Sequence, residues 1–256
     1  MRVVVFANNA VGLAVTRWLK DRGDDIVAVV VHPEGAQRLT REIVDASGVA
    51  ENAVFDGATL GEPAVLAMLA RLQPDIGVSA FFGHILRRPL LDLFAEGVVN
   101  LHPSYLPYNR GHSPNIWSIV DRTPAGVSLH YVDTGVDTGD IIARRVVPVE
   151  ADDTGETLYR RLEQECVRLF SDAWPDIVEH RAVRVPQPAS DATTHRRRDL
   201  DDIDHIDLDA TYTARELIDV LRARTFPPFK GAYFDVGDRR VYMELRLSSE
   251  KNEDAE

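Results

Sequence analysis

Residues 3–31, VVVFANNAVGLAVTRWLKDRGDDIVAVVV, contain the first strand-helix-strand pattern of the chain. Two apolar, β-branched runs at 3–6 and 26–31 are typical of buried strands, and the segment 11–19 between them is typical of a helix. Short apolar strands separated by helices indicate βαβ units and a mainly parallel sheet. Because such crossovers are right-handed, the helices are expected on both faces of the sheet.

The same alternation continues through the first two thirds of the chain. It predicts further strands at 53–55, 76–79, 98–101, 126–132 and 141–149, and helices at 36–46, 62–72, 89–94, 113–120 and 156–170. We therefore interpret residues 1–184 as one α/β domain with a Rossmann-like, mainly parallel sheet flanked by helices.

A linker and a small unit are predicted after this domain. Residues 185–198 are rich in proline, threonine and arginine, which is typical of a connecting segment. Within residues 199–256, a capping-box pattern that begins at Thr213 predicts the start of a helix. The strand-like runs 232–236 and 241–247 are joined through Gly-Asp, which predicts a β-hairpin.

The composition excludes several classes of protein. The net charge of −12 repels phosphate backbones, so a nucleic-acid partner is not expected. The single cysteine, Cys166, rules out an intramolecular disulfide and fits a reducing compartment. The first residues lack a secretory signal, and no segment approaches the roughly 20 apolar residues that a membrane helix needs. The expectation is a cytoplasmic protein with no membrane partner.

The turn after the first strand lacks the glycines of a dinucleotide site. Residues 7–12 are ANNAVG, with one glycine where the G-x-G-x-x-G fingerprint has three. Nicotinamide-dependent redox chemistry is therefore disfavoured. Asn8 and Asn9 either offer donors to a ligand or simply tolerate a tight turn.

Two polar constellations carry candidate chemistry. Asn100 and His102 end a predicted strand two positions apart, at the sheet edge where open α/β folds bind ligands. An amide beside an imidazole can stabilise a developing oxyanion and move a proton, although a polar strand end is the alternative. The loop 133–140 adds three aspartates, and the alternatives for it are a solvated loop or a metal-binding loop. A calcium EF-hand is excluded because the ligand spacing fails.

Over roughly residues 1–180, the sequence resembles the N10-formyltetrahydrofolate-dependent formyltransferases. The shared signature is Asn-x-His, Ser-x-Leu-Pro and Arg-Gly, followed by Val-Asp-x-Gly with its aspartate, Asp137, 35 positions after His102. The resemblance implies that Asn100, His102 and Asp137 are catalytic and that N10-formyltetrahydrofolate is the co-substrate. It implies no metal, and the spacing of His102 and His112 is not a recognisable zinc pattern.

The resemblance also implies a folate pocket with two walls. One wall follows the predicted strand 76–79, and the residues carried over are Phe82, Gly83, His84, Ile85 and Leu86. The other wall is the aspartate loop, with Asp133 and Gly135. Core packing is the alternative for Ile85 and Leu86.

Within this family the chain most resembles sugar N-formyltransferases that act on nucleotide-linked amino sugars. That resemblance rests on residues 105–111, 113–118, 123–127 and 221–234. Methionyl-tRNA formyltransferases have a longer, basic C-terminal domain, glycinamide ribonucleotide transformylases carry Pro-Gly at the Arg-Gly position, and formyltetrahydrofolate hydrolases carry an N-terminal regulatory domain. The expected acceptor is a dTDP-4-amino-4,6-dideoxyhexose used for surface glycans such as the O-antigen of lipopolysaccharide, with GDP- or UDP-linked sugars left open.

Substrate contacts are expected from Ser104, Tyr105, Arg110, Arg222, Arg224, Phe226 and Tyr233. The arginines can neutralise a diphosphate and the aromatic rings can stack on a base. The alternatives are helix capping for Arg222 and Arg224, and a small core or a dimer interface for the aromatic residues. The resemblance implies a homodimer formed through the C-terminal hairpin. Two other functions remain open, which are formyl transfer to another small-molecule amine and non-catalytic folate binding.

Overall fold

The computed structural model describes residues 1–250, and its centre is a seven-stranded sheet. The strand order is β3-β2-β1-β4-β5-β7-β8. The pairs from β3 to β5 are parallel, whereas β7 and β8 are added antiparallel. The bounds are β1 Arg2–Ala7, β2 Asp25–Val31, β3 Val54–Asp56, β4 Ile76–Ala80, β5 Val98–His102, β7 Gly126–Tyr131 and β8 Ile141–Val146. The predicted mainly parallel α/β sheet is confirmed.

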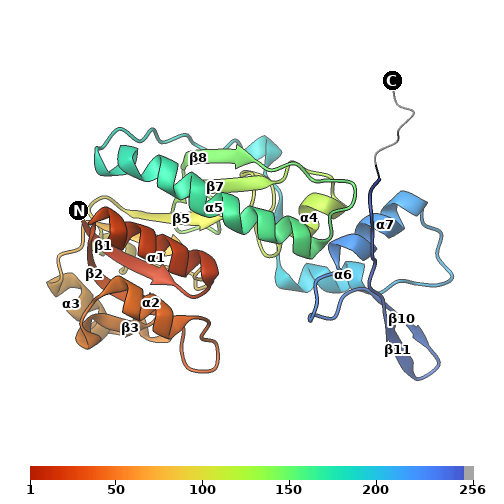
Figure 1. The fold of residues 1–256 in the computed structure, drawn as a ribbon, viewed down its shortest axis with the longest axis horizontal. Helices are drawn as coiled ribbons and strands as arrows, with labels where there is room; N and C mark the ends of the chain where they lie inside the picture. Colours follow the sequence, from red (N-terminus) through yellow and green to blue (C-terminus); the bar gives the residue numbers. More distant parts are fainter. Residues whose placement is uncertain (251–256) are drawn as a thin grey trace.

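Helices cover both faces of this sheet, as the crossover rule requires (Figure 1). Alternate residues of β1 point to opposite faces, so Val3 and Val5 belong to one core cluster while Val4 and Phe6 belong to the other. The first cluster packs under α1, α2 and α5, and the second packs under α3 and the segment 82–94. The helix bounds are α1 Ala10–Arg22, α2 Thr40–Ser47, α3 Pro63–Arg71, α4 Pro114–Val120 and α5 Gly155–Val178.

Capping residues mark both ends of α1 and the start of α5. Asn9 caps α1, because its side chain accepts hydrogen bonds from the first backbone N–H groups of the helix. Gly23 ends α1 with a φ of 86°, a left-handed conformation that glycine adopts without strain. Thr154 and Thr157 form a reciprocal capping box at the start of α5.

Several predicted elements differ from the structure. The helix predicted at 156–170 continues to Val178, and the strand predicted at 141–149 ends at Val146. The helix predicted at 36–46 begins only at Thr40, because Pro33 and Gly35 lie in a turn before it. The helix predicted at 89–94 is a single 3-10 turn, Leu91–Leu93, in which Leu90 and Phe94 are buried by tertiary packing. The last strand, predicted at 241–247, is Arg239–Tyr242.

The C-terminal unit lies at one end of the molecule, and its hairpin projects away from the sheet (Figure 1). It contains α6 Asp201–Asp204, α7 Ala214–Ala223, and the predicted hairpin of β10 Tyr233–Val236 and β11 Arg239–Tyr242. Helix α7 packs against α4 and α5. This unit is therefore seated on the α/β domain.

Residues 185–198, predicted as a linker, are hydrogen-bonded to the α/β domain. Val185 exchanges backbone hydrogen bonds with Ile141 at the start of β8. Further along, β9 (Thr194–His195) pairs with β6 (Arg110–Gly111), just beyond the end of β5. Residues 185–198 therefore form a strap across the loops at the carboxyl edge of the sheet, and we use the name strap for them below.

No helix among residues 1–250 combines the length and the apolar character that crossing a membrane requires.

Candidate active site

The structure brings Asn100, His102 and Asp137 together. Asn100 and His102 end β5 on one face, and Asp137 lies in the aspartate loop between β7 and β8. Because β7 runs antiparallel to β5, this loop leaves β7 beside Val99 near the start of β5 and folds back to bring Asp137 to His102. The Nε2 atom of His102 lies 3.6 Å from Oδ2 of Asp137, with side chains only 8% and 14% exposed. The three residues predicted to be catalytic thus form one cluster.

The carboxylate of Asp137 is held by a backbone donor. The Gly111 N–H donates to Oδ2 of Asp137 at 2.9 Å. Gly111 has a φ of 88°, and a Cβ atom there would lie 2.4 Å from the carbonyl oxygen of His195 in the strap. Only glycine brings its amide to Asp137 while fitting under the strap, which explains the Arg-Gly element of the motif.

His130 joins the cluster and was missed by the sequence analysis. It is 2% exposed, and its Nε2 lies 3.1 Å from Nδ2 of Asn100 and 3.5 Å from Oδ1 of Asp137. Its Nδ1 donates to the Tyr131 carbonyl at 2.7 Å, so Nε2 of the neutral ring accepts from Asn100. The available signal was a histidine near the end of the predicted strand 126–132, and the pairing of that strand with the one that carries Asn100 came only from the structure.

Burial and the neighbouring charges shift the pKa values of both His102 and Asp137 below their usual ranges. Burial lowers the pKa of His102, and the Asp137 carboxylate opposes this effect without cancelling it. Burial raises the pKa of Asp137, but His102 and the Gly111 N–H hold it well below its usual range. At neutral pH the arrangement is a neutral imidazole beside an ionised carboxylate, which is the state of a proton acceptor with its orienting anion.

Three predicted substrate residues in the loop 103–113 make contacts with neighbouring parts of the protein. Ser104 is fully buried, and its hydroxyl donates to the Tyr108 carbonyl at 2.6 Å. The ring of Tyr105 lies under the Arg144 guanidinium at 4.3 Å. Arg110 donates through Nε and Nη2 to Oε1 of Gln187, at 3.0 and 2.6 Å.

The loop predicted to bind folate presents a mixture of core and surface residues. Phe82 and Leu86 are 1% and 4% exposed, and the Phe82 ring packs edge-on against Phe6 in the core. Ile85 is 60% exposed, so the core-packing alternative does not apply to its side chain. Gly83 has a φ of 78° and is exposed, and the ring of His84 lies 4.6 Å from that of His32. The loop is thus anchored by Phe82 and Leu86 and offers Gly83, His84 and Ile85 outward.

The aspartate loop keeps its shape through Asp133 and Gly135. Oδ1 of Asp133 accepts from the Gly135 N–H at 2.9 Å and from the Thr138 hydroxyl at 2.6 Å. A Cβ atom on Gly135 would lie 2.1 Å from Oγ1 of Thr138. These two residues form the turn that carries Asp137 to its place.

Arg222 and Arg224 are engaged with protein partners. Arg222 pairs with Asp219 and donates to the backbone carbonyls of Glu150 and Asp153, while Arg224 forms a two-point pair with Asp204. Both arginine side chains are only 11% exposed. These contacts tie α7 to the α/β domain and to α6, and they leave few guanidinium donors for a ligand.

The two aromatic residues predicted near the acceptor pack within small clusters. Phe226 lies between Tyr159 and Phe229, with ring centroids 5.5 Å away from each. Tyr233 contacts His205 and Tyr242, and the Arg240 guanidinium lies 3.7 Å from its ring centre. This packing matches the small-core alternative for both residues.

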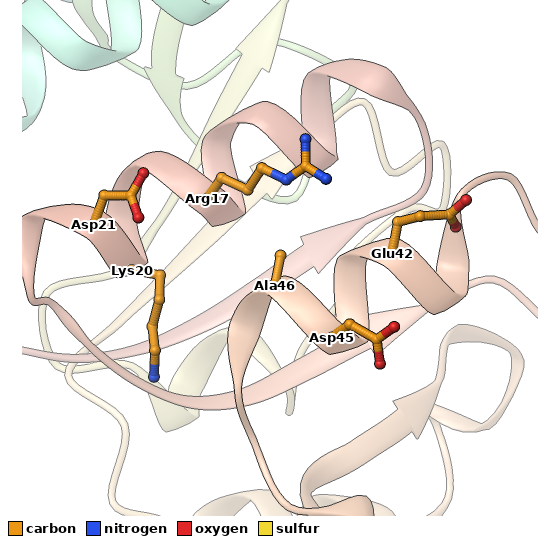
Figure 2. Close-up of a pocket in the computed structure, with 6 residues that line it drawn as sticks. All are labelled: Arg17, Lys20, Asp21, Glu42, Asp45 and Ala46. Atoms are coloured by element: carbon orange, nitrogen blue, oxygen red, sulfur yellow. The ribbon is translucent and has the colours of Figure 1, made fainter.

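A surface hollow of about 460 Å³ lies away from the cluster, between α1 and α2 (Figure 2). It is lined by Arg17, Lys20, Asp21, Glu42, Asp45 and Ala46. The α1 residues belong to the C-terminal half of that helix, which returns toward the amino ends of the strands. Among residues 1–250 no group of three His, Cys, Asp or Glu side chains is close enough to hold a metal ion.

The cluster has the parts for acyl transfer to a nucleophile. Asn100 supplies an amide donor, His102 a neutral imidazole and Asp137 a fixed anion. Comparison with known families gives the same conclusion independently, since residues 1–174 match the formyl transferase family. The chain belongs to the formyl transferase family. Residues 199–249 of this formyltransferase match the N-formyltransferase dimerization C-terminal domain.

Solved structures of related formyltransferases share the fold. The chain is 26% identical to a 4-N formyltransferase from Francisella tularensis, with a TM-score of 0.81 over 97% of this chain and 98% of that one. It is 27% identical to the formyltransferase PseJ from Anoxybacillus kamchatkensis, solved with UDP-4,6-dideoxy-4-formamido-L-AltNAc and tetrahydrofolate, with a TM-score of 0.56 over 79% of this chain and 89% of that one. An N-formyltransferase from Helicobacter canadensis, solved with folinic acid and dTDP-3-aminofucose, is 22% identical with a TM-score of 0.73 over 92% and 84% of the two chains, and shows the shared fold alone.

Proposed function

We propose that this formyltransferase moves the formyl group of N10-formyltetrahydrofolate to the amine of a nucleotide-linked amino sugar. The observation that carries the proposal is the convergence of Asn100, His102 and Asp137 at the carboxyl edge of β5, with a 3.6 Å approach of His102 to Asp137. The similarity to PseJ, solved with a UDP-linked formamido sugar and tetrahydrofolate, supports this pair of substrates.

Asn100 is proposed to stabilise the negative charge that develops on the formyl oxygen when an amine adds to it. One hydrogen of its Nδ2 is used by His130, and the second is free to meet the oxygen. A preorganised donor in such a position contributes about 10²–10³-fold to the rate.

His102 is proposed to take the proton that the amine loses on attack. Its pKa is lowered by burial, so the ring is neutral and its lone pair is available at neutral pH. Asp137 orients the ring and stabilises the imidazolium once it forms, a role for which its own low pKa suits it. The proton then passes to the departing N10 nitrogen of the folate.

The formyl donor is a substrate of this reaction, and the exposed groups of the two predicted walls support their proposed role in binding it. Ile85 offers an exposed apolar side chain beside the open backbone of Gly83, while Phe82 and Leu86 hold the loop from below. A planar, hydrogen-bonding ring system needs such a surface of backbone groups and apolar contact. Gly83, His84 and Ile85 on one side and the loop of Asp133 and Gly135 on the other are proposed to bind it.

The identity of the acceptor sugar and its biological use are also part of the proposal. We propose a dTDP-4-amino-4,6-dideoxyhexose as acceptor, in a cytoplasmic step of surface-glycan synthesis such as that of O-antigen lipopolysaccharide. Arg110 is the proposed contact for its anionic part, because it stands beside the catalytic cluster, and Ser104 and Tyr105 shape the loop below it. Arg222, Arg224, Phe226 and Tyr233 are proposed to act by fixing the C-terminal unit rather than by direct contact.

A homodimer through the C-terminal hairpin completes the proposal. Phe234 pairs with Val241 and Val236 pairs with Arg239, so these side chains share one face of the hairpin. Val236 and Val241 are 55% and 36% exposed, which leaves apolar surface on this face without cover beside Arg239. The match of residues 199–249 to a dimerization domain supports a second copy of this chain as its partner.

The test is mass spectrometry of a reaction with N10-formyltetrahydrofolate and a panel of dTDP-, UDP- and GDP-linked amino sugars. The expected result is one sugar that gains one formyl group, with no product from the His102→Ala variant. Folate binding without a product from any sugar would move the acceptor to another class of amine. Absence of both binding and product would overturn the proposal.

A further inference from the structure

Gln187 of the strap lies directly beside the catalytic cluster. Residues 183–191 are exposed except for Gln187, which is half-buried. Its side chain makes four hydrogen bonds to residues of the α/β domain and none of them is to its own segment. A single inward-facing amide in an exposed segment indicates that Gln187 has a role in holding the residues that it contacts.

The two ends of this amide serve different parts of the site. Nε2 of Gln187 donates to the carbonyl oxygens of Asp137 at 2.9 Å and Gly139 at 2.7 Å. Oε1 accepts from Nε and Nη2 of Arg110 at 3.0 and 2.6 Å. All hydrogen-bonding capacity of the amide is therefore used across two separate loops.

The backbone conformation of Asp137 must be stabilised by contacts with other residues. Its φ of 54° is left-handed, a conformation that costs a residue with a side chain free energy and persists only where its surroundings determine it. The carboxylate is held by the Gly111 N–H, and the backbone of the same residue is held by Gln187. With both contacts made, the position of Oδ2 relative to His102 is determined.

The strap is built to keep Gln187 in place. Pro186 and Pro188 flank it and restrict its backbone. The strap is anchored before Gln187 by the mutual hydrogen bonds of Val185 and Ile141, and after it by Thr193, whose carbonyl accepts from the Arg110 N–H at 3.0 Å. The anchors fix the strap, and the glutamine side chain reaches inward from it.

We infer that Gln187 is a positioning residue, which sets the Asp137 carboxylate against His102 and couples that position to the Arg110 guanidinium. The inference rests on the proposed function for its kinetic meaning, since a substrate anion at Arg110 would be linked through Gln187 to the catalytic aspartate. The contacts of Gln187 with Asp137 and Arg110 do not depend on which acceptor is used.

Two variants of Gln187 distinguish the role of its Nε2 donors from that of its Oε1 acceptor, and a third variant is the control. Gln187→Glu keeps an acceptor for Arg110 and removes both donors to the Asp137 and Gly139 carbonyls. Gln187→Met has a similar length and removes every hydrogen bond. Gln164→Met, on the exposed side of α5, is the matched control.

The kinetic expectation is a split between kcat and KM. Both Gln187 variants lose about 10- to 100-fold in kcat, because Asp137 is released from its set position. KM for the amino sugar rises more in Gln187→Glu than in Gln187→Met, because the new carboxylate pairs with Arg110 and competes with the substrate anion for the guanidinium. Melting temperatures near that of the control show that the fold is retained. Kinetics of both variants that match the control would overturn the inference.

A second measurement is independent of activity. NMR of the protein without substrates follows the Gly111 amide proton, which is bonded to Asp137, and the ring protons of His102. Both signals are expected to shift in the two Gln187 variants and to stay in Gln164→Met. If the wild-type protein formylates no sugar while these signals shift, the proposed function fails and the positioning role stands. Unchanged signals overturn the positioning role whatever the activity.

Discussion

Asn100 and His130 face each other across the antiparallel pair of β5 and β7, and Nδ2 of Asn100 donates to Nε2 of His130 over 3.1 Å. The other ring nitrogen of His130 donates to the Tyr131 carbonyl, which fixes the tautomer. Because only the amide nitrogen of Asn100 can donate to that lone pair, a buried histidine decides which way the Asn100 amide points. His130 thus orients the amide that we propose as the oxyanion donor.

Replacing His130 is expected to weaken catalysis through Asn100. In His130→Ala the amide loses its partner and can rotate, so kcat should fall about 10-fold or more while the KM of both substrates changes little. Steady-state kinetics measure this, with the exposed His180→Asn variant as control. A fall confined to thermal stability, with kcat intact, would show that His130 only fills the core.

Removing the amide of Asn100 is expected to cost more. Asn100→Ala should reduce kcat by about 10²–10³-fold, because the donor to the formyl oxygen is lost. The control is Asn52→Ala, at an exposed position in a surface turn. Single-turnover rates with saturating substrates separate this effect from weaker binding, and near wild-type rates in Asn100→Ala would contradict the assignment.

The pH profile tests the role of His102. Burial lowers its pKa below 6.5, and the neutral ring is the proposed base, so kcat/KM should rise as pH increases through that lowered pKa. Asp137 acts in the opposite direction and raises the pKa of His102. In Asp137→Asn the acid limb should therefore move to lower pH, along with a loss of rate.

The pH profiles of the wild type and of Asp137→Asn are measured with the same amino sugar, so the titration of the substrate amine contributes equally to both. A limb that moves to higher pH in Asp137→Asn, or a wild-type rate that falls as His102 loses its proton, would exclude His102 as the base.

The ion pair of Arg224 and Asp204 is expected to affect stability rather than substrate affinity. Their side chains are 11% and 16% exposed, so Arg224→Met leaves a largely buried carboxylate without its partner. The free energy of unfolding should fall by about 3 kcal/mol. Urea denaturation measures this change, and the double variant with Asp204→Leu should recover part of it.

The exposed pair of Arg41 and Asp45 offers the control for this experiment. Their side chains are 92% and 72% exposed, so Arg41→Met should leave the unfolding free energy nearly unchanged. If Arg224→Met leaves stability unchanged and instead raises KM for the nucleotide sugar, then Arg224 contacts the substrate directly.

The hairpin face is expected to control assembly. Val241→Arg places a charge in the apolar face that also carries Val236, and burying that charge against a second copy is unfavourable. Light scattering should then give a monomer where the wild type gives a dimer. Asp238→Asn in the hairpin turn is the control. A monomeric wild type would refute the proposed dimer.

Much of the fold could be predicted because its signals are local. The apolar runs of β1, β2, β4 and β5 are buried on both sides, and such runs are visible in one sequence. The errors fall where packing overrides local pattern: Leu90 and Phe94 are buried as in a helix, although only Leu91–Leu93 forms a 3-10 turn. The strap escaped prediction because its prolines and polar residues are typical of a linker.

Most strands, the capping box at Thr213 and the Asn-x-His and aspartate motifs could be predicted from the chain alone, because they depend on neighbours within a few positions or on a recognisable spacing. The partners of those motifs follow from the tertiary fold. His130 meets Asn100 because β7 pairs antiparallel with β5 in one register, and Gln187 meets Asp137 because the strap folds back over the sheet edge. Such contacts join residues 30 and 50 positions apart, and their geometry follows from strand order and packing, which no local pattern contains.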